Sequence, residues 1–265
     1  MSMPILPSWL GGRLPKEEPA ASEGSTMDSI YAIGDIHGCS DLLRDRLDAI
    51  RAHAAGHGIV RPRLVLLGDY GDRGPDTKGV LDILTGPEAS GFDLVPLLGN
   101  HDAALTAILR GGEPSAEWLH EEGGRATMDS YGPCLRSRNL RIAAKKFRAA
   151  VPAAHKSFLA DLLLSWRWGR WFFSHAGIDP RRALDEQSYD ALVYGHREWL
   201  PCMRTSAEPT LIERFGTVVV HGHWTEPDRR PAVHGHRVGL DTGAGLAYGR
   251  LTAAAFHEDR AEVLS

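Results

Sequence analysis

Short apolar runs that end abruptly at glycine or a polar residue predict the strands of this chain. Leu64-Val65-Leu66-Leu67 is typical of a fully buried strand, because the run is short, continuous and closed by Gly68. Gly169 joins two further runs into a predicted β-hairpin. Together the runs predict strands within 29–33, 64–67, 92–98, 164–167, 171–173, 217–220, 238–243 and 251–256.

Apolar positions at helical spacing separate the first three strands. Ser40 suits the N-cap of a helix whose apolar stripe includes Leu43 and Leu47, and a second helix is expected from Asp76 to Thr85. This alternation of strands and helices is typical of an α/β protein with parallel strands. Because the carboxyl ends of such strands meet at one edge of the sheet, ligands are expected to bind there.

Polar clusters stand at the predicted strand ends. Gly68-Asp69-Tyr70-Gly71-Asp72-Arg73-Gly74 places two carboxylates and a guanidinium on one turn, which taken alone is compatible with a surface ion pair. Asp35 and His37 alternate, so both project to one side of an extended backbone, although a loop hydrogen bond explains an isolated pair equally well. Five strands end in this manner, which predicts one shared site. The strand ends supply Asp35, His37, Asp69, Asn100, His175 and His223.

These six side chains predict a pair of metal ions. Mixed oxygen and nitrogen donors suit manganese, iron or zinc better than calcium, and the absence of cysteine argues against a closed structural zinc site. Six ligands are too many for one tetrahedral ion, so two ions bridged by Asp69 are predicted, with manganese expected and iron or zinc as alternatives. Two ions ~3.5–4 Å apart clamp the attacking and departing oxygens of a phosphoryl displacement.

Composition sets wider limits. The 265 residues, 43% hydrophobic and 24% charged, are typical of one large globular domain, and the net charge of -4 gives no overall attraction to nucleic acid. No apolar run approaches the ~18 residues of a membrane helix. Cys39, Cys134 and Cys202 are odd in number and widely spaced, which favours a reducing compartment, the cytoplasm. Residues 1–28 lack periodicity and predict a flexible tail before a domain spanning 29–265.

A helical cap insertion is predicted at about 111–160. Basic residues gather there from Arg136 to Lys156 without one acidic residue. A solvated helix face is the favoured explanation. The alternative is a surface that attracts phosphorylated or acidic substrates.

The chain resembles the calcineurin-like metallophosphoesterases in five ordered motifs: Gly34-Asp35-Ile36-His37-Gly38, the stretch Gly68 to Gly74, Gly99-Asn100-His101-Asp102, His175-Ala176-Gly177 and Gly222-His223. Within that superfamily it resembles the PPP-type serine/threonine phosphatases, in the compact form of bacteria and phages. The similarity runs from about Ile30 to Phe256. It implies a four-layer α/β/β/α sandwich with a dinuclear metal site at its top edge.

The resemblance implies a role for each motif residue. It places on the first metal Asp35, His37 and Asp69, and on the second Asp69, Asn100, His175 and His223. It makes His101 the general acid and Asp72 the carboxylate that orients this imidazole. The arginines expected to grip phosphate are Arg73 and Arg197, whose planar guanidinium suits phosphate oxygens.

Three positions depart from the family pattern. Gly71 stands where Val is usual, Asp102 where Glu is usual, and Gly195 where an aromatic residue commonly precedes the second arginine, which weakens the assignment of Arg197. His221 shares the strand-end face with His223. A supporting or structural role for His221 is favoured over that of a further ligand.

The expected activity is metal-dependent hydrolysis of phosphate monoesters, in the first place phosphoserine and phosphothreonine in proteins, by a hydroxide held between two metal ions. The alternative is symmetrical hydrolysis of dinucleoside polyphosphates such as diadenosine tetraphosphate, which uses the same motifs. An inactive metal-binding scaffold is disfavoured, because every ligand type and His101 are present. The expected partner is a phosphorylated protein or small phosphoester, with no nucleic acid and no membrane, and the expected state is a monomer.

Overall fold

The computed structural model describes residues 29–132, 139–199 and 215–264, and within these ranges it contains two five-stranded sheets. The predicted tail, residues 1–28, lies outside the described residues. Across the parts of the chain that the structure describes, every helix is too short or too polar to cross a membrane.

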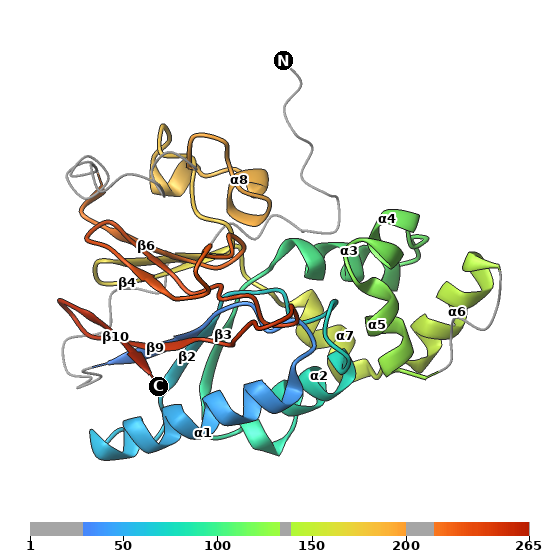
Figure 1. The fold of residues 1–265 in the computed structure, drawn as a ribbon, viewed down its shortest axis with the longest axis horizontal. Coiled ribbons are helices and arrows are strands. Elements are labelled where there is room, and N and C mark those ends of the chain that lie inside the picture. Colours follow the sequence, from blue (N-terminus) through green and yellow to red (C-terminus); the bar gives the residue numbers. More distant parts are fainter. Residues whose placement is uncertain (1–28, 133–138, 200–214, 265) are drawn as a thin grey trace.

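The first sheet holds the early parallel strands in the order β10-β9-β1-β2-β3. β1, β2 and β3 run parallel, and β9 lies antiparallel to both β1 and β10. The helices that connect the parallel strands cover the outer face of this sheet (Figure 1). The elements are β1 (Ile30–Ile33), α1 (Ser40–Gly56), β2 (Arg63–Leu66), α2 (Thr77–Thr85), the 3-10 helix η1 (Pro87–Ala89), β3 (Asp93–Pro96), β9 (Ala253–Phe256) and β10 (Ala261–Leu264).

The second sheet has the order β4-β5-β6-β8-β7. The predicted hairpin supplies β4 and β5, and β5, β6 and β8 run parallel. Helix α8 lies over the outer face of this sheet (Figure 1), which confirms the four-layer sandwich. The elements are β4 (Ser165–Trp168), β5 (Trp171–Ser174), the 3-10 helix η3 (Leu184–Glu186), α8 (Tyr189–Val193), β6 (Val218–His221), β7 (Ala232–Val233) and β8 (Arg237–Gly239).

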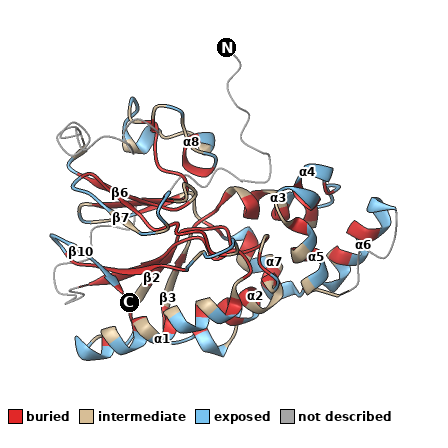
Figure 2. Cartoon of the chain, viewed as in Figure 1, coloured by how far each residue is buried: buried red, intermediate tan, exposed pale blue. Residues whose placement is uncertain are grey.

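Side-chain alternation along the strands divides the core into two layers. Ile30 and Ala32 of β1 join the cluster between the two sheets, together with Phe173 of β5. Tyr31 and Ile33 point the opposite way and join the cluster beneath the helices. Both sheets are therefore buried along most of their length, whereas α1 keeps an exposed outer face (Figure 2). β1, β5, β6 and β9 are buried along their whole length, as expected of strands in sheets covered on both sides.

Helices fill the region between β3 and β4. They are α3 (Asn100–Leu109), α4 (Ala116–His120), α5 (Gly124–Ser130), α6 (Leu140–Ala150) and α7 (Ala153–Ala160). Figure 1 shows them grouped beside the sheets, with α6 at the outer end. The helices α4 to α7 lie within the predicted insertion at 111–160, whose boundaries as a cap remain an interpretation.

The basic run is partly occupied by contacts within these helices. Arg141 pairs with Glu113 (Nε–Oε1 2.9 Å), and Arg148 donates to the carbonyl of Gly112 (3.0 Å). Lys156 donates to the carbonyl of Arg148 (2.7 Å). Arg136 and Arg138 lie outside the described residues. These contacts agree with the favoured explanation of an ordinary helix surface.

Three details of the elements differ from the sequence prediction. Cys39 occupies the N-cap position of α1, and Ser40 is the first helical residue, whose hydroxyl donates to Asp76 instead (Oγ–Oδ2 2.7 Å). The strand β7 is too short for a periodic signal. β10 was missed because an edge strand with exposed residues such as Glu262 has no continuous apolar run.

Candidate metal centre

The five loops that follow β1, β2, β3, β5 and β6 meet at one edge of the two sheets. The backbone N–H of His37 donates to the carbonyl of Asp69 (2.8 Å), which joins the first loop to the second. The N–H of Gly222 donates to the carbonyl of His175 (2.9 Å), which joins the last two. The convergence expected at the carboxyl ends of parallel strands is therefore seen directly.

Asp102 ties the second loop to the third. Its buried carboxylate accepts hydrogen bonds from the backbone N–H groups of Asp69 (2.7 Å), Tyr70 (2.9 Å) and Gly99 (3.0 Å). Aspartate at this position, where the family usually has glutamate, therefore still accepts hydrogen bonds from both loops. Sequence reasoning did not assign Asp102 a role, although its place at the third position of α3 favours a capping acceptor.

Two glycines leave room for the carboxylates of the site. A Cβ on Gly99 would lie 2.1 Å from Oδ1 of Asp69, and a Cβ on Gly222 would lie 1.9 Å from Oδ1 of Asp35. Neither position tolerates a side chain without moving a predicted ligand. The glycines of these motifs are therefore required by close packing around the site.

Left-handed backbone is concentrated in the same loops. Within the described ranges, five of the seven non-glycine residues with positive φ belong to the predicted site: His37 (44°), Asp69 (53°), Asp72 (68°), Arg73 (63°) and His223 (59°). Such a conformation costs ~1–3 kcal/mol at each residue and persists where the surroundings fix it. The loops are therefore held in one strained arrangement that aims these side chains together.

Asp69 lies in the middle of the predicted ligands. Its Oδ2 is 3.7 Å from Nε2 of His37 on one side and 3.4 Å from Nε2 of His175 on the other. Burial raises the pKa of Asp69, but His175, His101 and His37 outweigh that effect and hold the pKa below its ordinary value. An ionised carboxylate between two imidazoles is what a bridging ligand requires.

Two histidines beside Asp69 have their Nδ1 atoms bound to backbone carbonyls. Nδ1 of His37 donates to the carbonyl of Gly71 (2.9 Å), and Nδ1 of His175 donates to that of Leu67 (2.8 Å), which leaves each Nε2 as the lone-pair nitrogen. Burial lowers the pKa of His37 to about 3, and its Nε2 is buried without a hydrogen-bond partner. An orphaned imidazole nitrogen facing a carboxylate fits a metal ligand.

The remaining predicted ligands complete the two groups. Oδ1 of Asn100 lies 3.1 Å from Nε2 of His175 and 3.0 Å from Nδ1 of His223. Burial, followed by His175, lowers the pKa of His223 to about 3. Asp35 lies further off, with Oδ2 4.0 Å from Nε2 of His37. Ligands of one ion with bonds of ~2.1 Å stand ~3–4 Å apart, so these separations fit.

The buried carboxylates near Asp35 also favour the binding of cations. Burial raises the pKa of Asp35 well above its ordinary value, and the carboxylates of Asp241 and Asp69 raise it further. Divalent ions would offset this repulsion and keep Asp35 ionised. Close donor atoms form two groups that share Asp69: His37 with His101, and His175 with His223.

His101 and Asp72 form a hydrogen-bonded pair beside the ligands. Nδ1 of His101 lies 2.8 Å from Oδ2 of Asp72. Burial lowers the pKa of His101, but the charge of Asp69 and the hydrogen bond to Asp72 raise it to about 9 overall. The carboxylate of Asp72 thus favours the protonated imidazole of His101, the form that can donate a proton.

Two residues from the helices next to the sheets hold Asp72 in place. Nε1 of Trp118 donates to Oδ2 of Asp72 (2.8 Å), and the hydroxyl of Thr127 donates to Oδ1 (2.6 Å). Trp118 comes from α4 and Thr127 from α5. Sequence reasoning did not predict this support for Asp72, because nothing local shows that an indole N–H reaches a carboxylate on another loop.

The two predicted arginines differ in position. Nη2 of Arg73 lies 3.4 Å from Nε2 of His101, so its guanidinium is beside the acid. The side chain of Arg197 is 83% exposed and pairs with Glu198 (Nε–Oε1 3.4 Å). The structure therefore brings Arg73 into the site and does not bring in Arg197, whose phosphate contact stays a prediction.

The structure shows which groups lie next to His221 and Gly195, two positions noted in the sequence. Nδ1 of His221 lies 2.9 Å from the carbonyl of Gly222 and its Nε2 lies 3.5 Å from Nη1 of Arg237, so both ring nitrogens have neighbours other than the predicted ligands. A Cβ on Gly195 would lie 2.5 Å from Cζ2 of Trp224. Trp224 therefore packs closely against Gly195 and leaves no room for a side chain there.

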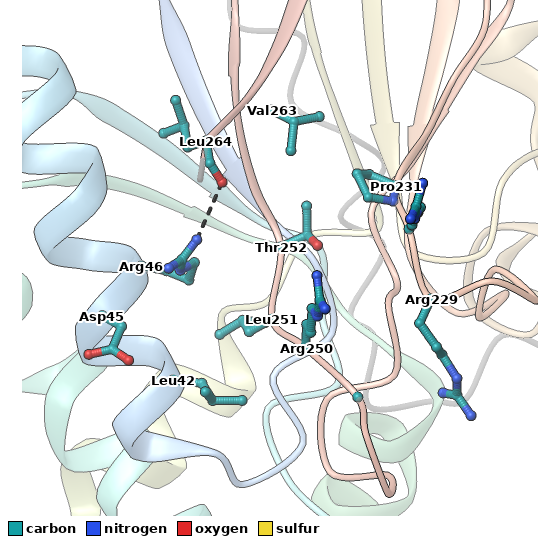
Figure 3. Close-up of a pocket in the computed structure, with 12 residues that line it drawn as sticks. Leu42, Asp45, Arg46, Arg229, Pro231, Arg250, Leu251, Thr252, Val263 and Leu264 are labelled. Carbon is teal, nitrogen blue, oxygen red and sulfur yellow. Dashed lines mark hydrogen bonds between the residues drawn. The ribbon is translucent and has the colours of Figure 1, made fainter.

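A cavity of ≈ 490 Å³ lies elsewhere, between α1, the end of β10 and the loops around Arg229 and Arg250 (Figure 3). None of the predicted site residues lines it. The predicted centre is therefore separate from this cavity.

The family model of calcineurin-like phosphoesterases matches residues 29–259. The chain belongs to this family. It is therefore a metallophosphoesterase, a hydrolase of a family that uses a dinuclear metal centre, and its histidines and aspartates form groups able to bind metal.

Curated relatives carry the name bis(5'-nucleosyl)-tetraphosphatase, symmetrical. The protein of Nitrosomonas europaea is 40% identical over 81 residues, which are 31% of this chain and 27% of that protein. The protein of Cellvibrio japonicus is 40% identical over 197 residues, 74% of this chain and 58% of that protein. The chain therefore spans less than two thirds of the length of these relatives.

Solved structures show the same fold. One provisionally named a diadenosine tetraphosphatase aligns with a TM-score of 0.59 at 21% identity, over 90% of this chain and 94% of that chain. The cold-active protein-tyrosine phosphatase of a psychrophilic Shewanella aligns with a TM-score of 0.53 at 15% identity, over 90% and 80%. Likeness at these identities concerns the fold alone.

Proposed function

We propose that this metallophosphoesterase hydrolyses dinucleoside tetraphosphates symmetrically, into two nucleoside diphosphates. The observation that carries the proposal is the name shared by the relatives from Nitrosomonas europaea and Cellvibrio japonicus. It favours the alternative considered from the sequence over the phosphoprotein substrate expected first.

Two divalent ions, for which we propose manganese, would be held by Asp35, His37 and Asp69 and by Asp69, Asn100, His175 and His223. When bound they supply Lewis-acid charge and lower the pKa of the attacking water. The chain contributes the fixed geometry. Asp69 stands between the imidazoles of His37 and His175. Its Oδ1 also accepts a hydrogen bond from the backbone N–H of His101, which fixes the carboxylate in place.

His101 delivers a proton to the departing oxygen. Asp72 keeps His101 oriented and protonated, while Trp118 and Thr127 keep Asp72 in place. Arg73, beside His101, binds oxygens of the phosphate under attack. Arg197 would take part only after its exposed side chain turns inward.

A second candidate is the hydrolysis of phosphoserine or phosphothreonine. The observation that favours it is the raised pKa of His101, about 9, because a protonated acid is most useful to an alkoxide leaving group. A nucleoside diphosphate leaves through a phosphate oxygen, whose pKa of ~6 makes protonation less necessary.

The same proposal includes the bounds of the catalytic domain, the cap, the compartment and the oligomeric state. We place the catalytic domain at 29–265, with the helices at about 111–160 as a cap beside the substrate, and the protein as a cytoplasmic monomer. Trp118 and Thr127 support a role for the cap, because they connect it directly to Asp72.

One assay panel with manganese tests the function. Diadenosine tetraphosphate, phosphoserine and phosphothreonine peptides and an aryl phosphate are compared by kcat/KM, and nucleotide products are separated by chromatography. We expect the tetraphosphate to be the best substrate and to yield ADP alone. Products of ATP and AMP, or a preference for phosphopeptides, would contradict the proposal.

A further inference from the structure

A second group of histidines lies at the opposite edge of the first sheet from the metal centre. It consists of His53, His57, His257 and Glu262, here called the His-Glu cluster. His53 and His57 lie one turn apart at the end of α1, His257 directly follows β9, and Glu262 is on β10. The C-terminal end of α1 lies beneath β10 (Figure 1).

Contacts between α1 and β10 fix this arrangement. Arg46 of α1 donates to the carbonyl of Leu264 on β10 (3.3 Å, Figure 3). Further along the helix, Nε2 of His53 lies 3.8 Å from Oε1 of Glu262. On the other side, Nε2 of His257 lies 3.6 Å from Oε2 of the same carboxylate. Glu262 therefore stands between two imidazoles, as Asp69 does in the metal centre.

His57 adds a third imidazole. Its ring stacks on that of His53, with centroids 4.3 Å apart and planes 22° apart, and its centroid lies 6.4 Å from that of His257. His57 is the C-cap residue that directly follows α1, four residues after His53, and the two rings lie on the same side of this helix end.

The other nitrogen of each ring already has an oxygen neighbour. Nδ1 of His53 lies 3.0 Å from the hydroxyl of Tyr31, and Nδ1 of His257 lies 2.7 Å from the hydroxyl of Ser29. Nδ1 of His57 donates to the carbonyl of His53 (2.8 Å). Such partners orient metal-binding imidazoles and leave Nε2 as the ligand. All three rings share this pattern.

His257 supplies an independent sign of a missing ligand. The residue is 8% exposed, and its Nε2 is buried without a hydrogen-bond partner. A buried polar atom without a partner costs ~1–3 kcal/mol. The only other imidazole nitrogen with this property in the described ranges is Nε2 of His37, in the metal centre.

We propose that the His-Glu cluster binds one zinc ion through the three Nε2 atoms and the carboxylate of Glu262. Zinc accepts such nitrogen and oxygen donors at ~2.0–2.2 Å in tetrahedral geometry, which places ligands ~3.3 Å apart. The donor atoms of the cluster stand further apart than this, since no three of its residues have donor atoms that all lie within 4.8 Å of one another. Binding therefore requires the half-exposed Glu262 and the exposed His57 to move inward. The ion joins α1 to the β9–β10 hairpin.

Counting zinc in the full chain tests the proposal. Wild type and a His57→Ala/Glu262→Gln double variant are equilibrated with zinc, freed of excess by gel filtration and analysed for metal per chain. The double variant should hold one ion fewer than wild type. His234→Ala is the matched control, since His234 is exposed and stacks on another histidine (6.0 Å) but lies outside the cluster. It should hold as many ions as wild type.

Thermal unfolding gives a second readout. Zinc at ~100 times its dissociation constant should raise Tm by roughly 5–10 °C more in wild type and His234→Ala than in the double variant. Phosphoesterase activity should be equal in all three, because no substituted residue belongs to the metal centre. Equal zinc content and equal Tm shifts in wild type and the double variant would overturn the proposal. A double variant that unfolds without zinc is replaced by Glu262→Gln alone, held to the same criterion.

Discussion

The two histidine groups at opposite edges of the first sheet are built in different ways. In the metal centre, His37 and His175 are fully buried, and His37 and Asp69 have left-handed backbone. In the His-Glu cluster, His53 lies within a regular helix and the side chain of Glu262 is 49% exposed. The first group is held by buried packing and by hydrogen bonds between loops, whereas the second has to close around an ion. Rigid placement is what catalysis requires, and a flexible clamp is sufficient for a structural ion.

Substitution of Asp69 should have the largest effect, because it should disrupt the metal centre and leave the His-Glu cluster intact. Asp69→Asn takes away the charge between His37 and His175, so we expect the centre to retain at most one ion and kcat/KM to fall by ~10³-fold or more. Zinc at the His-Glu cluster should be unaffected. Metal analysis with kinetics is the measurement, and Asp48→Asn, whose side chain is 76% exposed, is the control. Two catalytic ions and normal turnover in Asp69→Asn would remove Asp69 from the bridging position.

A variant of His101 tests whether this residue of the metal centre acts as the general acid. His101→Asn should lower kcat by ~10²–10⁴-fold for a phosphoserine peptide, whose alkoxide needs a proton. The effect on an aryl phosphate or a dinucleoside tetraphosphate should be much smaller, because their leaving oxygens are less basic. Equal losses on all substrates with both ions retained would show that His101 positions the substrate and is not the acid.

Replacement of Asp72 should change the pH profile. The pKa of His101 is raised to about 9, and a general acid works while protonated, so activity on a phosphoserine peptide, whose leaving oxygen needs a proton, should fall as pH rises through that pKa. Asp72→Asn removes the carboxylate that favours the protonated imidazole. The alkaline limb of kcat/KM should therefore move by ~1–3 units to lower pH. An unmoved limb would mean that another group sets it.

The smallest effect concerns the two arginines. Arg73→Ala should raise KM more than Arg197→Ala, because Arg73 lies beside His101 and Arg197 is 83% exposed. Steady-state kinetics on diadenosine tetraphosphate compares them. A larger effect of Arg197→Ala would show that its side chain swings into the site when substrate binds.

The sequence was sufficient for the parts of the fold that are local in the chain. β1, β2 and β3 are each followed closely by a glycine and a polar residue, so the parallel strands and the convergence of Asp35, Asp69 and Asn100 could be predicted. The short β7 and the exposed β10 gave no apolar run. The support of Asp72 by Trp118 and Thr127 was not predictable, because it joins segments far apart in the chain through single polar atoms.

The His-Glu cluster illustrates the same limit. His53 and His57 stand close together at the end of one helix, but His257 and Glu262 join them only through the pairing of β9 with β1 and β10. For Arg197 the sequence motif predicted a contact with phosphate, whereas in the structure its side chain is exposed and pairs with Glu198.

The central claim is that two metal ions share Asp69 at the edge of the sheets. Anomalous diffraction from crystals grown with manganese tests it most directly. The account predicts two peaks ~3.5–4 Å apart on either side of Oδ2 of Asp69, one near His37 and the other near His175 and His223. A single peak, or two peaks that do not share Asp69, would contradict it.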